Sequence, residues 1–306
     1  IGLISFEKLG RTVFGTCEQE GGKVSESTKR LSWSTSRVVT IGLNTFREAV
    51  RMKLFIAMTI LAMCTLASSF LFREFNFGSS ELKFIADFGF GGMTVFGSAL
   101  AVIVTAQLFY GEIEHRTALT LLAKPIHRSE FVLGKFFGSW ATVTCFLGML
   151  SVCLVFVLWF RETSILAEYP DEFEGGRRIV QYGEIVWFSV VQVFRIGILC
   201  AVVILFSTYA TSSLFAMVMG VLVWIAGQLQ HIATEARGVV DNLILKSVYA
   251  FASFALPNFH LFDVGEKLAL GESLPSSVYL KLFVYAFLYS SFYLAVASAS
   301  FNRREL

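Results

Sequence analysis

Long apolar runs that carry almost no charge set the strongest limit on how this chain can fold. A helix rises about 1.5 Å per residue, so about 20 apolar residues cross the roughly 30 Å hydrocarbon core of a bilayer. Six runs of about that length lie at residues 54–72, 91–110, 136–160, 187–209, 211–229 and 282–301. The sequence therefore predicts an all-α integral membrane protein with six transmembrane helices.

The composition supports a membrane protein and argues against other classes. Of the 306 residues, 55% are hydrophobic and 16% are charged, whereas a soluble domain carries about 25% charged residues. The runs are continuous rather than alternating, which argues against a β-barrel. The formal net charge of +2 gives no basis for a nucleic-acid partner, and we predict none.

The chain carries no recognisable motif for catalysis or for binding a metal or nucleotide. Its five cysteines lie mostly inside apolar runs without metal-ligand spacing, and its four histidines are scattered. A phosphate-binding loop is absent from the sequence, because Gly134 and Lys135 are followed by phenylalanine. Glu112 and Glu114 would diverge by about 200° on a helix, so they cannot share a substrate. We therefore expect no enzyme activity, no cofactor and no metal in this chain.

The distribution of lysine and arginine predicts which segments face the cytoplasm. The segments 37–53, 111–135, 207–213 and 302–306 would share one side of a six-span protein. They are about twice as dense in lysine and arginine as the segments on the other side, which marks them as cytoplasmic. We predict a multi-pass protein of the plasma membrane, the inner membrane in bacteria, with both termini in the cytoplasm.

Two segments outside the spans have recognisable patterns. Residues 35–53 predict an amphipathic interfacial helix, because apolar side chains recur there at helical spacings, namely Val38, Ile41, Phe46, Val50 and Leu54. Residues 243–262 are broken by Pro257 and Asn258, which predicts short re-entrant helices on the outer side before the last span. A seventh span is the alternative for that segment. We divide the chain into an N-terminal extension and linker, 1–36, and a six-span domain, 37–306.

The segment 111–135 is dense in charge and lies between two apolar runs. Glu112 and Arg116 are four residues apart and would pair on one helix face. Pro125 would end that helix, because proline disfavours helical geometry in the residue before it. Ser129 would cap the next helix. The pattern predicts two helices joined by a sharp turn at the cytoplasmic surface, with apolar residues that need a partner to cover them.

These residues carry a resemblance to a known family. Residues 112–135 resemble the pattern E-x-E-x-x-T-x-x-x-L-L-x-x-P-[IV]-x-R-x-x-[FIL]-x-x-G-K of type-two ABC transporter permeases, which follows the second of six spans. Residues 44–51 are similar to the family's connecting helix, and residues 256–263 to its P-N-x-x-x-F-[DN] element. The resemblance covers about residues 37–306. Among the branches of the family, the chain is most similar to the stand-alone six-span permeases linked to copper-enzyme maturation.

The resemblance implies a partner and a mechanism. Two permease subunits, identical or related, would pair within membrane lipid, each docking on a separate cytoplasmic ATPase subunit that binds ATP and magnesium. The coupling helix between spans two and three would receive the push of the ATPase, and most such families export. The expected coupling residues are Glu112, Glu114, Arg116, Thr117, Leu121, Pro125 and Arg128. The alternatives are a membrane anchor that couples an ATPase to a complex without transport, and a membrane-embedded enzyme.

Arg195 is the one charge inside an apolar run of the sequence. Such a residue is a candidate for the transport pathway or for gating. If the fourth span begins near Gln192, however, Arg195 lies one turn from the outer end, where its side chain would snorkel to water. A hydrogen bond between helices is the third interpretation.

Overall fold

The computed structural model describes residues 33–69, 80–114, 127–168, 180–239, 255–265 and 275–303. Within these ranges every regular element is a helix, and Trp33–Leu306 forms one compact unit. In chain order the elements are α2 (Thr35–Val50), α3 (Lys53–Ser68), α4 (Ser80–Glu114), α6 (Arg128–Glu168), α7 (Tyr182–Tyr209), α8 (Ser213–Val239), the short 3₁₀ helix η2 (His260–Phe262) and α11 (Ser276–Arg303). The predicted all-helical class is confirmed for the described residues.

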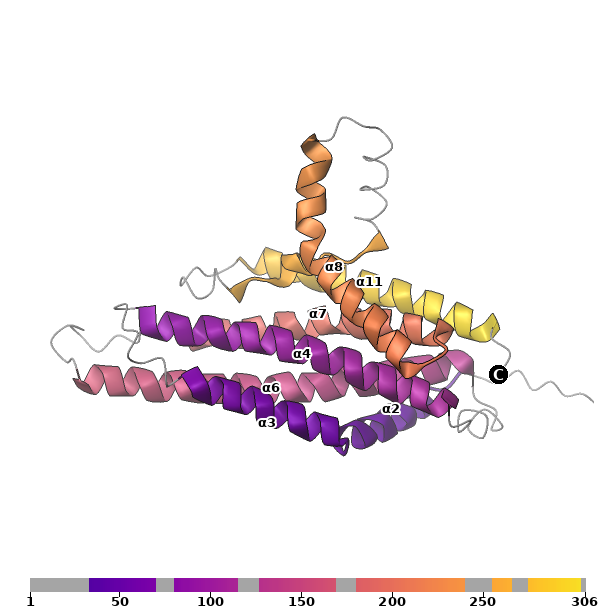
Figure 1. Ribbon diagram of the computed structural model, residues 1–306, viewed down its shortest axis with the longest axis horizontal. Coiled ribbons are helices and arrows are strands. Elements are labelled where there is room, and N and C mark those ends of the chain that lie inside the picture. Colours follow the sequence, from indigo (N-terminus) through magenta and orange to yellow (C-terminus); the bar gives the residue numbers. More distant parts are fainter. Residues whose placement is uncertain are drawn as a thin grey trace, which may run out of the picture. The chain divides into compact units, whose positions relative to one another are not determined.

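Among the described residues, five helices are long and apolar enough to cross a membrane: α4, α6, α7, α8 and α11. The pair α2 and α3, bent by 61° at its break, makes up to a sixth span. The bend lies where Met52 takes an extended conformation, with φ −66° and ψ 134°, between two helical stretches. Figure 1 shows α4, α6 and α7 running side by side, with α3 along α6.

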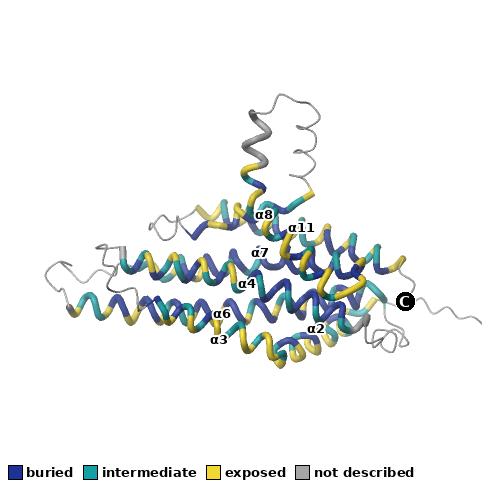
Figure 2. Tube along the Cα trace, viewed as in Figure 1, coloured by how far each residue is buried: buried dark blue, intermediate teal, exposed yellow. Residues whose placement is uncertain are grey.

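Helix α7 forms the centre of the bundle. It packs against α4, α6, α8 and α11, and 72% of its most apolar stretch is buried, compared with 28% in α8 and in α11. Figure 2 shows this contrast as a nearly continuous buried trace along α7. A helix buried on all sides has no lipid-facing stripe, so its apolar pattern could not reveal which face meets which neighbour.

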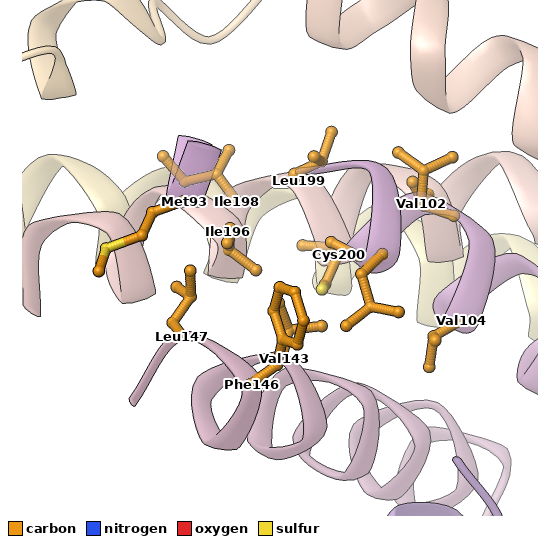
Figure 3. Close-up of a cluster of buried hydrophobic side chains, with 14 of the residues drawn as sticks. Met93, Val102, Val104, Val143, Phe146, Leu147, Ile196, Ile198, Leu199 and Cys200 are labelled. Carbon is orange, nitrogen blue, oxygen red and sulfur yellow. The ribbon is translucent and has the colours of Figure 1, made fainter. Parts of the chain in front are cut away.

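The core lies where α4, α6 and α7 meet, and its side chains are fully buried (Figure 3). The labelled members are Met93, Val102 and Val104 of α4, Val143, Phe146 and Leu147 of α6, and Ile196, Ile198, Leu199 and Cys200 of α7. Hydrogen bonds also link the helices: Trp140 Nε1 donates to the Val193 carbonyl at 2.9 Å, and Ser189 Oγ to Ser151 Oγ at 2.8 Å. Such bonds and close packing hold helices together in lipid.

The predicted amphipathic helix is present as α2, but its buried face differs from the expected one. The buried residues are Val38, Gly42, Thr45 and Ala49, which are mostly small, whereas Ile41, Phe46 and Val50 are only partly buried. Small residues are required because α2 crosses α6 very closely. A Cβ on Gly138 would lie 2.6 Å from the carbonyl oxygen of Gly42.

Helices α4 and α6 extend beyond the predicted spans, and charged residues near their shared end are paired. Helix α4 begins at Ser80 rather than near residue 91, and α6 runs from Arg128 to Glu168 rather than over 136–160. At the shared end of these helices, Arg161 binds Glu81 through two hydrogen bonds of 2.6 and 3.0 Å. Charged residues that satisfy one another in this way allow a helix to continue past its apolar run.

Candidate functional site

The predicted coupling residues flank a stretch that the structure does not describe. Glu112 and Glu114 belong to the last turn of α4, and Arg128 is the first residue of α6. The predicted residues Arg116, Thr117, Leu121 and Pro125 lie outside the described residues, so their role stays a prediction.

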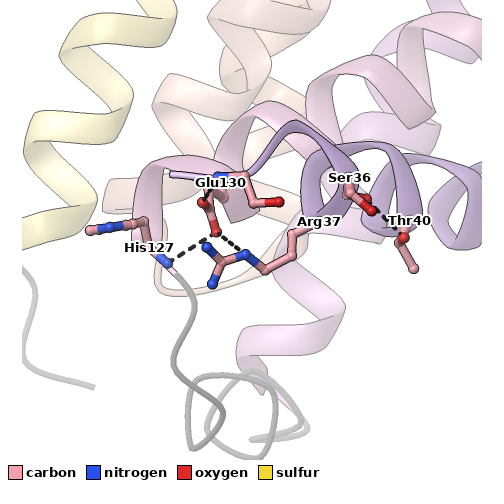
Figure 4. A network of polar contacts seen from close by, with 6 residues as sticks. Ser36, Arg37, Thr40, His127 and Glu130 are labelled. Carbon is pink, nitrogen blue, oxygen red and sulfur yellow. Dashed lines mark hydrogen bonds and ion pairs between the residues drawn. The ribbon is translucent and has the colours of Figure 1, made fainter. Parts of the chain in front are cut away.

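Glu130 organises the start of α6. Its carboxylate is fully buried and accepts a hydrogen bond from the Ser34 amide at 2.7 Å and from the His127 amide at 3.3 Å. Arg37 of α2 forms an ion pair with it, Nε to Oε2, at 3.3 Å. Figure 4 shows Glu130 between these groups, joining α2 to α6. A buried carboxylate is tolerated because these donors replace its water.

The predicted cap at Ser129 is wrong. Helix α6 begins at Arg128, and the carbonyl of His127 accepts the first helical bonds, from the amides of Glu130 at 2.9 Å and Phe131 at 3.3 Å. Glu130 reaches back to the His127 amide, which is the glutamate half of a capping box. Sequence reasoning could have found this arrangement from a glutamate three residues after the cap position.

A second ion pair joins α2 to α6 about one turn further along. Lys135 of α6 is only 2% exposed, and its Nζ lies 4.0 Å from Oε2 of Glu48, a side chain that is 51% exposed. The ammonium also lies 6.0 Å from the centre of the Phe131 ring. Together with Glu130 and the close crossing at Gly42 and Gly138, this pair makes α2 and the start of α6 one block.

Arg128 ties the start of α6 to the end of α11. Its Nη1 donates to the carbonyls of Phe301 at 2.9 Å and Asn302 at 3.2 Å. These carbonyls belong to the last turn of α11, where a helix has no partners of its own and carries partial negative charge. The rings of Phe109, Phe131 and Phe301 gather beside this contact at centroid distances of 5.7 to 5.9 Å.

The contacts at this end bring together the segments that we predicted to share one side. Glu130 links α6 to α2, Arg128 links it to α11, and the Tyr110 hydroxyl of α4 donates to the Thr211 carbonyl in the turn between α7 and α8. We call these contacts, carried by Arg37, Tyr110, Arg128, Glu130 and Lys135, the junction. The junction holds fixed both helix ends that flank residues 115–126.

Arg195 lies deeper in the bundle than we expected. Helix α7 begins at Tyr182 rather than near Gln192, which places Arg195 at the middle of a 28-residue helix. Its side chain is 1% exposed and does not reach a helix end, so the snorkelling interpretation is wrong. The residues before Gln192 also belong to α7, and Glu184 in its first turn accepts a hydrogen bond from the Tyr279 hydroxyl at 3.3 Å.

The surroundings of Arg195 are polar on one side and aromatic on the other. Its Nη1 donates to Gln192 Oε1 at 3.2 Å, and its guanidinium lies 5.7 Å from the centre of the Phe259 ring. Among the described residues, Nε and Nη2 have no hydrogen-bond partner. Gln192, which sequence reasoning did not single out, connects this cation to the segment 255–265.

Pro257 and Asn258 lie in that segment, which we predicted as a re-entrant turn. Pro257 is buried, and the Asn258 amide donates to the Tyr285 hydroxyl of α11 at 2.8 Å. Asn258 Oδ1 accepts from the His260 amide at 3.1 Å, the local turn that asparagine side chains favour. Residues 243–254 of the predicted short helices lie outside the described part of the chain. Within residues 255–265, the 3₁₀ helix η2 lies between Ala255 and Gly265, which are themselves helical.

Comparison with known proteins identifies the family. The family model described as ABC-2 family transporter protein matches residues 39–306. No curated protein sequence matches the chain. The matched region begins in α2 and includes every helix of the bundle that follows. The chain is therefore a multi-pass membrane protein that belongs to the ABC-2 family of transporters, as a permease.

Proposed function

We propose that this chain is the permease subunit of an ATP-driven exporter, and that residues 111–135 dock on a separate ATPase subunit in the cytoplasm. Membership of the ABC-2 transporter family supports a permease role. The observation that carries the docking proposal is the junction, which anchors the helix ends on both sides of residues 115–126. Because the flanking ends of α4 and α6 are both held by contacts with other helices, a force applied between them would pass into the bundle.

The proposed mechanism runs from the docking segment into α6. Closure of the ATPase subunits displaces residues 111–135, and the displacement enters α6 at Arg128. Because Glu130, Lys135 and the glycine crossing join α2 to α6, the two helices move as one block. Helix α6 has 41 residues and a length of about 60 Å, so it carries the movement to the ion pair between Arg161 and Glu81 at the other end.

The proposal has consequences for partners and location. A second permease copy, identical or related, completes the pathway within the lipid bilayer. The ATPase subunit binds ATP and magnesium, and this chain performs no catalytic step. The junction, the N-terminal approach and the end of α11 face the cytoplasm of the plasma membrane. The resemblance of residues 112–135 to exporter permeases favours outward transport.

Co-purification tests the docking step. The tagged chain, solubilised gently from its native membrane, should retain a protein that carries an ABC-type phosphate-binding loop, identified by peptide mass spectrometry. Arg116→Glu and Pro125→Gly should each reduce its recovery at least fivefold, because they invert a contact charge and relax the turn. Lys281→Glu is the matched control, since Lys281 is exposed at the opposite end of α11. Unchanged recovery in both docking variants would contradict the proposal.

A further inference from the structure

The segment 255–265 lies along the first half of α7, as far as its midpoint, rather than over its end. A Cβ on Gly265 would lie 3.1 Å from the Phe188 ring, the Phe262 carbonyl accepts from Gln192 Nε2 at 3.4 Å, and the Phe259 ring lies under Arg195. Residues 188, 192 and 195 share one face of a helix. The segment therefore runs antiparallel to α7 for about two turns, or roughly 10 Å.

Contacts with α8 and α11 also place the segment 255–265 inside the bundle. The Phe259 amide donates to the Gly227 carbonyl of α8 at 3.0 Å. The Tyr293 hydroxyl of α11 donates to the Ala255 carbonyl at 2.6 Å, and the Tyr285 hydroxyl accepts from Asn258. Gly227, Tyr285 and Tyr293 all lie well inside their helices. Most of this backbone is non-helical and sits among three spanning helices.

Such backbone is tolerated at membrane depth only where protein or water replaces lipid around it. Here side chains of neighbouring helices satisfy the segment, and Gln192 serves the Phe262 carbonyl. Gln192 is oriented in turn by Arg195, whose Nη1 donates to its Oε1. The carboxylate of Asp263 attracts the same cation, and the Phe259 ring faces it. One buried cation thus contacts the segment directly and through Gln192.

We propose that Arg195 and Gln192 form an anchor that holds residues 255–265 against α7, and that this segment is released as a unit when the anchor opens. The anchor suits a releasable contact. The bond from Gln192 to Phe262 is long at 3.4 Å. Of the three guanidinium nitrogens of Arg195, Nη1 alone donates a hydrogen bond within the described residues.

The role in transport rests on the proposed function; the anchor itself does not. In the proposed exporter, the segment closes the outer half of the bundle while the anchor is formed. Arg195 is then a positioning residue that acts through the segment and need not touch the transported molecule. A purely structural arginine would differ, because its loss would weaken the whole bundle rather than free one segment.

Thiol accessibility separates these cases without the ATPase or a substrate. The five native cysteines are replaced, and Val264→Cys introduces one thiol at a position that is 6% exposed. The protein is placed in lipid nanodiscs, where both faces are open, and the rate of labelling by a polar maleimide is measured. Arg195→Met and Gln192→Leu should each raise this rate at least tenfold. Arg195→Lys, which keeps the charge and a donor, should stay within threefold of the parent.

Arg161→Met is the matched control, because Arg161 is a mostly buried arginine whose ion-pair partner, Glu81, belongs to α4 and not to the segment. It should leave the labelling rate unchanged. The melting temperature of Arg195→Met should not fall, since methionine keeps an apolar side chain at this position and removes the desolvation cost of a buried charge. Unchanged labelling in both Arg195→Met and Gln192→Leu would overturn the proposal. So would faster labelling that appears only together with a lower melting temperature.

Discussion

Glu130 is the residue on which the junction depends most. Its carboxylate is fully buried and receives two backbone amides and the Arg37 guanidinium. Each of these donors comes from a helix start or its approach, so one side chain fixes the relative position of α2 and α6. Arg128 complements it by closing the end of α11. Both residues lie near the end of the proposed docking segment, residues 111–135.

Glu130→Gln should lower the free energy of unfolding by about 1–3 kcal/mol, because a charge-assisted bond is lost and a buried amide donor faces Arg37. Reversible unfolding in mixed micelles measures this difference. Glu48→Gln is the control: Glu48 is 51% exposed and 4.0 Å from Lys135, so its loss should cost less than about 1 kcal/mol. Equal costs for the two variants would contradict the importance of Glu130.

At the scale of helices, the close crossing of α2 and α6 explains why the two helices would move as one block. Gly134 and Gly138 are four residues apart on α6 and face Gly42 of α2, with a Cβ on Gly42 only 3.3 Å from the Gly134 carbonyl. Small residues at this spacing let two backbones approach closely. A larger side chain at Gly138 would meet the backbone of α2, which cannot rotate away as a side chain could.

Gly138→Leu should therefore separate α2 from α6 and destabilise the protein by about 1–3 kcal/mol. Gly148→Leu provides the control on the same helix, since a Cβ there meets nothing within 4 Å. Leucine favours helix over glycine, so the control should be neutral or stabilising by up to about 1 kcal/mol. Unfolding midpoints compare the two directly. Destabilisation of similar size in both would show that the crossing is not the cause.

The helices themselves could be predicted from the apolar runs, but their ends and partners could not. The start of α4 was misplaced because the partner of Glu81, Arg161, lies on another helix. Arg195 was expected near a helix end because Gly183 and Glu184 are typical of a segment at the membrane interface that precedes a span. The pairing of Gly138 with Gly42 depends on tertiary contact, which spacing within one helix does not reveal. The structural role of Glu130 was not predicted, because the charged residues of 111–135 were all interpreted as contacts for a partner.

At the scale of the whole molecule, the contacts of charged side chains among the described residues gather at the two ends of the bundle, with one exception. One end holds the junction. The other holds the pairs of Arg161 with Glu81 and of Tyr182 with Glu162. The exception is the cluster of Arg195 and Gln192 with residues 255–265. In the proposed exporter, the junction receives the movement, α6 carries it, and this central cluster responds.

Site-specific photo-crosslinking tests the central claim most directly. A photoreactive amino acid is placed at Leu121 in the docking segment and, as the control, at Leu280, which is 64% exposed at the opposite end of α11. Irradiation of native membranes should join residue 121, but not residue 280, to a subunit with an ABC-type phosphate-binding loop. Absence of that adduct at residue 121, or an equal yield at both positions, would contradict docking of an ATPase on residues 111–135.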